Sequence, residues 1–65
     1  MTTDDFVKYM TMAKGEFFSR FHLPVVNIQV YEETDEFITF ELEGATETGY
    51  RHEVARVVIK KRERW

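Results

Sequence analysis

The chain has 65 residues, with nine Lys and Arg against twelve Asp and Glu, for a net charge of −3. A domain of this size buries only about 60 % of the surface that its unfolded chain exposes, so it needs dense packing, disulfides, a metal or a partner. The sequence has no cysteine, which excludes disulfides and thiolate metal sites. Six Phe, three Tyr and one Trp favour dense packing or oligomerisation of one small domain spanning residues 1–65.

No stretch approaches the roughly 18 continuous apolar residues that cross a membrane. The N-terminal residues MTTDDFVKY are acidic and lack the apolar core of a signal peptide. These features predict a cytoplasmic protein with no membrane partner.

Charge is distributed unevenly along the chain. Residues 1–49 carry three basic and ten acidic side chains, a net charge of −7, whereas residues 50–65 carry six basic and two acidic side chains, a net charge of +4. The basic end is suited to contact nucleic acid, an acidic partner, or the acidic part of its own fold.

Residues 2–22 are predicted to form a helix. Thr2 and Asp5 have the spacing of a capping box. The negative charge of Asp5 is also favourable near the positive, N-terminal end of the helix dipole. Pro24 disfavours helical geometry at Leu23, so we expect the helix to end near His22.

The apolar residues of this helix form a stripe. At 100° per residue its members fall within a sector of about 80°: Phe6, Met10, Ala13, Phe17 and Phe21. Val7 and Phe18 widen the stripe on one side and Tyr9 widens it on the other, while Gly15 falls on the polar side. We expect the stripe to pack on a sheet.

Residues 25–43 (VVNIQVYEETDEFITFELE) are predicted to form a β-hairpin, because two alternating runs flank an acidic break. Matching the apolar faces gives a register, with four pairs: Val26 with Leu42, Ile28 with Phe40, Val30 with Ile38 and Tyr31 with Phe37. This register leaves Glu32 to Glu36 as the loop, and it gives the helix an apolar face to cover.

Residues 44–49 (GATETG) are predicted to form a polar loop. The β-branched residues in 50–61 favour a third strand, with Ala55, Val57 and Ile59 toward the core and Arg56, Val58 and Lys60 outward. The fold class is therefore α+β, an N-terminal helix on a three-stranded antiparallel sheet (αβββ). The alternative is a second helix in this region (αββα), and residues 62–65 are expected to be a tail.

The sequence offers little for catalysis or metal binding. The acidic stretch Glu32 to Glu36 lacks the pattern of a calcium loop and is read as a solvated turn. His22 is expected at the helix C-terminus and His52 on a strand, without further converging ligands. No catalytic motif is present, so we predict a protein that is not an enzyme and uses neither cofactor nor metal.

Tyr31 and Phe37 are expected on the sheet face turned away from the helix. There they form either a platform for a protein partner or a second copy of the chain, or an ordinary cross-strand pair. The acidic residues around them disfavour nucleic acid on that face. The predicted function is a small non-catalytic binding or regulatory protein that acts through protein–protein contacts, including self-association.

The alternative function is nucleic-acid binding by the basic C-terminal strand and tail. The candidate residues provide phosphate contacts and one stacking side chain: Arg56, Lys60, Lys61, Arg62, Arg64 and Trp65. A pI near 5.3 argues against this alternative, because nucleic-acid binders usually present a basic surface.

Overall fold

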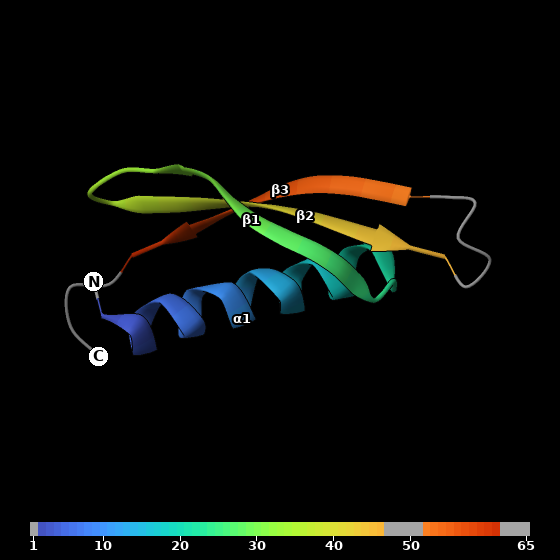
Figure 1. Ribbon diagram of the computed structural model, residues 1–65, viewed down its shortest axis with the longest axis horizontal. Helices are drawn as coiled ribbons and strands as arrows, with labels where there is room; N and C mark the ends of the chain where they lie inside the picture. The colour runs from blue at the N-terminus through green and yellow to red at the C-terminus, as the bar shows by residue number, and fades with distance from the viewer. Residues whose placement is uncertain (1, 47–51, 62–65) are drawn as a thin grey trace.

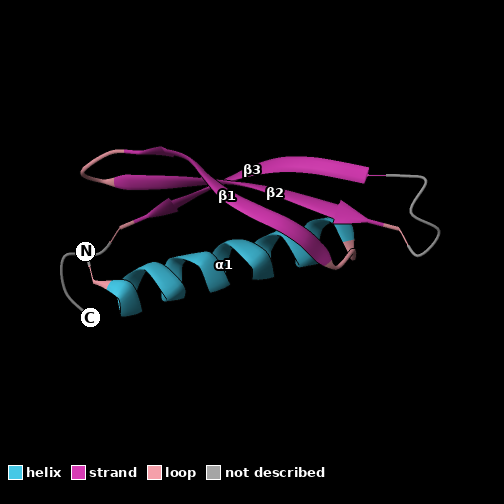
Figure 2. Ribbon diagram, in the orientation of Figure 1, coloured by secondary structure: helices cyan, strands magenta, loops and turns pink. Residues whose placement is uncertain are grey.

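The structure, a computed structural model, describes residues 2–46 and 52–61. It contains one helix, α1 (Thr3–Phe21), followed by the strands β1 (Val25–Glu33), β2 (Phe37–Ala45) and β3 (His52–Lys60). The strands form one antiparallel sheet in the order β1-β2-β3, and α1 packs on one face of it (Figures 1 and 2). The αβββ prediction is confirmed, and the alternative with a second helix in residues 50–61 is wrong.

Both ends of α1 follow from local sequence. The Thr2 hydroxyl accepts a hydrogen bond from the Asp5 amide (3.1 Å), and the Asp5 carboxylate accepts one from the Thr2 amide (3.4 Å). At the other end His22 is left-handed (φ 56°) and its amide donates to the Phe18 carbonyl (2.8 Å). The predicted capping box and helix end are confirmed.

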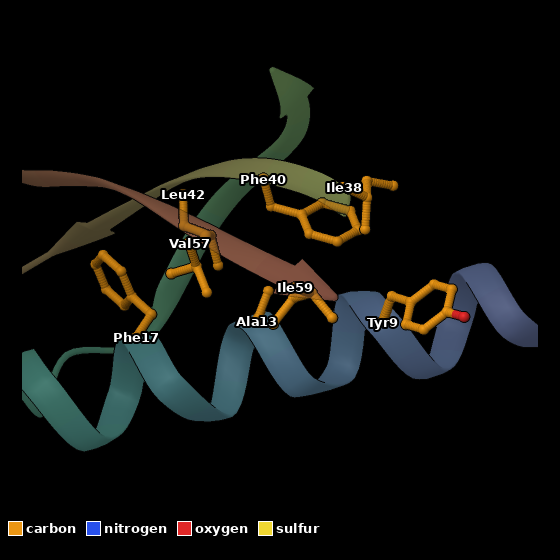
Figure 3. Packing of buried hydrophobic residues seen from close by; sticks show 8 residues of the cluster. All are labelled: Tyr9, Ala13, Phe17, Ile38, Phe40, Leu42, Val57 and Ile59. Carbon is orange, nitrogen blue, oxygen red and sulfur yellow. The ribbon is translucent and has the colours of Figure 1, made fainter. Parts of the chain in front are cut away.

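The core lies between α1 and the two strands β2 and β3. Its buried members come from all three elements (Figure 3): Tyr9, Ala13, Phe17, Ile38, Phe40, Leu42, Val57 and Ile59. Phe6 adds an edge-on contact to Phe40, with ring centroids 5.7 Å apart. The expectation that Val7 and Phe18 widen the buried stripe is wrong, because α1 is rolled toward Tyr9 and leaves both exposed.

The pairing of β1 with β2 differs from the prediction. Ile28 lies opposite Leu42 and Val30 lies opposite Phe40, which shifts the predicted register by two residues. The register also shifts by one residue at two places, at Val26 and at Tyr31, and each of these residues forms a β-bulge. A simple alternation pattern does not encode an extra residue in one strand, so the sequence-based register could not include these bulges.

The two bulges move side chains from one sheet face to the other. Val25 lies opposite Gly44 and packs against the core, whereas Val26, predicted to face the core, is exposed. Past the second bulge, Glu33 lies opposite Ile38. β1 therefore runs on to Glu33, and the turn shrinks from the predicted five residues to residues 34–36.

The pairing of β2 with β3 is continuous from Phe37 opposite Lys60 to Ala45 opposite His52. As predicted, Val57 and Ile59 are buried under α1, Ala55 packs against the core, and Val58 points outward. One prediction is corrected here: Gly44 and Ala45 belong to β2, not to a loop. Of the rest of the predicted loop, Thr46 follows β2 outside the strand, and residues 47–49 lie outside the described residues.

Candidate functional site

The candidate site is the outer face of the sheet, defined here as the face turned away from α1. A polar row crosses its centre, from Gln29 on β1 through Glu41 on β2 to Arg56 on β3. The Gln29 side-chain amide donates to Glu41 Oε1 (3.0 Å), and Arg56 Nε donates to Glu41 Oε2 (3.3 Å). One carboxylate thus connects all three strands, and the row fixes the position of the guanidinium group.

Arg56 also orients an aromatic side chain. Its guanidinium carbon lies 3.7 Å from the centroid of the Tyr31 ring, within the range of a cation–π contact. Tyr31 occupies the second bulge of β1, which takes it out of the regular alternation. Half of the Tyr31 surface remains exposed, so the ring is held from one side and accessible from the other.

The predicted pair of Tyr31 with Phe37 does not form, because the β1–β2 register places Glu32 opposite Thr39 and Glu33 opposite Ile38, and leaves Tyr31 in the second bulge. Both side chains nevertheless lie on the outer face, as expected. Phe37 (40 % exposed) and Val58 (58 % exposed) occupy diagonal positions of the β2–β3 ladder. Tyr31, Phe37 and Val58 are exposed apolar side chains of the outer face near the turn end of the sheet, with Thr39 between Glu32 and Val58, and they are called the apolar patch here.

Charged side chains border this patch. Glu32 lies opposite Thr39 on one side, and Lys60 lies opposite Phe37 on the other. A shallow open depression next to the polar row is lined by Glu41, Val54, Ala55 and Arg56. The outer face is therefore an open surface with an apolar patch and a charged border.

The acidic turn is a compact local structure. The Thr34 hydroxyl accepts hydrogen bonds from the amides of Phe37 (3.0 Å) and Glu36 (3.3 Å), and the Thr34 amide donates to the Phe37 carbonyl (2.8 Å). Within residues 2–46 and 52–61, no group of three or more His, Asp or Glu side chains is placed to hold a metal ion. A turn is confirmed for residues 34–36, whereas Glu32 and Glu33 of the predicted turn belong to β1.

The basic residues of β3 and Lys61, which follows the strand, do not form one patch. Arg56 is held by Glu41 and Tyr31, while the Lys61 ammonium pairs with Glu33 and its side chain is only 16 % exposed. Lys60 is exposed on the outer face, beside Phe37. The other three nucleic-acid candidates, Arg62, Arg64 and Trp65, lie outside the described residues.

Both histidines lie in the elements predicted for them, His22 at the end of α1 and His52 on β3. His22 caps α1 and stacks edge-on with Phe18, with centroids 6.0 Å apart. His52 begins β3, and its Nδ1 lies 3.4 Å from a Glu43 carboxylate oxygen. Both side chains are exposed and lie at the same end of the sheet, because Gly44 pairs with Val25 on one side and with Glu53 on the other.

Sequence reasoning missed the role of Glu41 and Arg56 in this site. The alternation predicted for each strand places both side chains on the outer face, but alternation does not set the β2–β3 register that puts Glu41 opposite Arg56. The contact of Arg56 with Tyr31 was not predictable either, since it depends on the bulge at Tyr31.

Comparisons with protein families, with curated proteins and with solved structures found no match to this chain. In the part of the chain that is described, no helix is both long enough and apolar enough to cross a membrane.

Proposed function

We propose that this protein is a non-catalytic binding or regulatory protein that contacts a protein partner through the outer face of its sheet. The observation that carries the proposal is the apolar patch of Tyr31, Phe37 and Val58 beside a fixed Arg56. Aromatic and arginine side chains dominate the energetics of protein interfaces, and an apolar centre with a charged border is the usual anatomy of such a surface.

Preorganisation supports the same proposal. Arg56 is already bonded to Glu41 and stacked on Tyr31, so little side-chain entropy remains to be lost when a partner covers these groups. The patch is open rather than concave, which suits a protein surface better than a small molecule.

The first test is residue-specific crosslinking followed by affinity measurement. A photo-reactive side chain at position 37 is expected to crosslink a partner in cell extract, and the same group at exposed Met12 on α1 serves as the matched control. Binding of the identified, purified partner is then measured with Tyr31→Ala and Phe37→Ala. We expect each substitution to weaken the affinity by about tenfold or more.

Met12→Ala should leave that affinity unchanged, and thermal melting should show that all three variants remain folded. An unchanged affinity for both Tyr31→Ala and Phe37→Ala would place the partner contact elsewhere and overturn the proposal.

The nucleic-acid alternative gains no support from the described residues, because Arg56 and Lys61 are each paired with a carboxylate. A titration with labelled RNA and DNA at two salt concentrations distinguishes nucleic-acid binding from the proposed protein contact. Binding that falls steeply with salt and is abolished when Lys60, Lys61 and Arg62 are changed to Glu would move the function to this class.

A further inference from the structure

The core constrains the position of β1 less than it constrains the other two strands. α1 packs chiefly on β3 and β2 and least on β1. Val30 lies directly opposite the fully buried Phe40, yet it is 42 % exposed. The helix therefore contributes little to fixing where β1 lies along β2, and the register of this pair depends mainly on its own ladder.

The observed β1–β2 ladder contains two interruptions. It pairs seven β1 residues, but Val26 and Tyr31 are left out of the pairing as bulges. A bulged residue is unpaired and locally disrupts the ladder. Val26 is also 55 % exposed, so an apolar, β-branched side chain is largely withheld from the core. The observed register thus leaves both backbone pairing and apolar burial incomplete in β1.

A second register without bulges fits the same two strands. It is the regular register predicted from the alternation pattern, in which residues 25–31 pair with residues 37–43 without interruption. It pairs as many β1 residues as the observed ladder does. Between Asn27 and Val30 the two registers differ by two residues, and a shift of two keeps each side chain on its own face of the sheet.

The core can accept β1 in either register. In the observed register Val25 packs against the core and Val26 is exposed. In the regular register the two valines exchange roles, because Val26 then lies opposite the buried Leu42, on the face that α1 covers. Ile28 and Val30 stay on that face, again opposite buried residues of β2. The apolar side chains that face the core therefore do not decide between the two registers.

The outer face keeps an amide partner for Glu41 in both registers. In the observed register Gln29 lies opposite Glu41 and donates its side-chain amide to Glu41 Oε1 (3.0 Å). In the regular register Asn27 takes that place, and its shorter side chain carries the same amide group. The pair of Arg56 with Glu41 belongs to the continuous β2–β3 ladder and does not depend on β1.

The two registers differ most at the turn end of the sheet. In the observed register the Tyr31 ring lies on Arg56, and Glu33 pairs with Lys61. The regular register moves Tyr31 beside Phe37 and takes Glu33 out of the strand that holds it next to Lys61. A partly exposed ion pair and a cross-strand aromatic pair each make a small contribution to stability, so the loss of one is comparable with the gain of the other.

We propose that β1 is a two-state strand, which exchanges between the observed register and the regular register and so moves Tyr31 between Arg56 and Phe37. The minor state of such an exchange is populated at about 0.1–10 %. The exchange itself is a property of the sheet. Its use as a switch rests on the proposed function, because only the observed register presents Tyr31 together with Arg56 to a partner.

Disulfide trapping in the full chain tests the exchange, since the sequence has no cysteine of its own. Asn27→Cys combined with Glu41→Cys places the two thiols on directly opposite residues only in the regular register. In the observed register these two positions are diagonal, with Cα atoms about 8 Å apart, which is too far for a disulfide. Glu41→Cys with Val54→Cys is the matched control, because Val54 is diagonal to Glu41 across the continuous β2–β3 ladder.

The pair at positions 27 and 41 is expected to oxidise about tenfold faster than the control pair or more, because exchange of β1 brings its thiols together without unfolding. The two pairs have nearly equal separations along the chain, 14 and 13 residues, so global unfolding would close both at similar rates. Similar rates would therefore overturn the proposal. No partner takes part in this measurement, so its outcome is separate from that of the test of the proposed function.

A substitution at Val26 gives a second test. Val26→Lys should leave the observed register intact, since Val26 is exposed there, but it would bury a charge beneath α1 in the regular register. Added to the chain with cysteines at 27 and 41, it should lower the oxidation rate by about tenfold or more. Val54→Lys, at a similarly exposed valine of β3, is the control and should leave that rate within about twofold. An oxidation rate that Val26→Lys changes no more than Val54→Lys does would overturn the proposed exchange.

Discussion

At the scale of single residues, the two described glycines have opposite surroundings. A Cβ atom on Gly44 would lie 2.7 Å from Phe17 Cε1 and 3.1 Å from Leu23 Cβ, whereas one on Gly15 would meet nothing within 4 Å. Gly44 is thus required by the close approach of α1 to β2, at the end of the helix where Phe17 also packs on Phe21. Among the described residues, nothing lies close enough to Gly15 to require a glycine there.

The same substitution at these two sites should therefore have opposite effects. Gly44→Ala should destabilise the fold by about 1–3 kcal/mol through overpacking against Phe17. Gly15→Ala should stabilise the fold by up to about 1 kcal/mol through helix propensity. Urea unfolding measures both, and two shifts of the same sign would contradict the packing described at Gly44.

At the scale of elements, β2 is the central strand and supplies the middle of the core. Ile38, Phe40 and Leu42 are fully buried beneath α1, with β1 on one side and β3 on the other. Every other element depends on this strand for pairing or packing, so a defect in β2 cannot be confined to one part of the fold.

Phe40→Ala is expected to cost about 3–5 kcal/mol, enough to unfold a domain whose core supplies only a few kcal/mol net. Loss of the cooperative thermal transition in the Phe40→Ala variant would show that the domain is unfolded. Val58→Ala, which truncates an exposed side chain on β3, is the control and should melt within a few degrees of the parent. A Phe40→Ala variant that melts as the control does would contradict the core.

The helix and the strands were predictable from the sequence, whereas the pairing of β1 with β2 was not. The α1 caps, the identity of all four elements and the inward residues of β3 followed from capping chemistry, β-branching and alternation. The β1–β2 register did not follow, because the bulges at Val26 and Tyr31 change which side chains share a face. The candidate site was likewise predictable only in part. Alternation predicted that Tyr31 lies on the outer face, but its contact with Arg56 depends on a bulge and was not predictable.

At the scale of the whole molecule, contacts between distant parts of the chain hold the fold together. α1 packs chiefly on β3, the element farthest from it in sequence. The end of β3 is also tied to the first hairpin, because the Lys61 amide donates to the Glu36 carbonyl (2.8 Å) and the Lys61 side chain pairs with Glu33. The last described residue thus closes the structure at the β1–β2 turn.

This arrangement predicts which parts open together. Native-state amide exchange should give α1 and β3 the same free energy of opening, since neither element keeps its apolar cover without the other. Amides at the β1–β2 turn should exchange through local openings that have a lower free energy. Exchange of α1 amides at a free energy well below that of β3 would show that the helix detaches alone, and would contradict this coupling.

The pairing of the first element with the last has a consequence for synthesis on the ribosome. A nascent chain that has emerged through β2 carries a complete amphipathic helix and a hairpin, but not Val57 or Ile59, which close the core over them. Until β3 emerges, the apolar stripe of α1 lacks its main cover and is available to chaperones or to neighbouring chains. Folding of this domain is therefore expected to be late and abrupt, completed only when its third strand arrives.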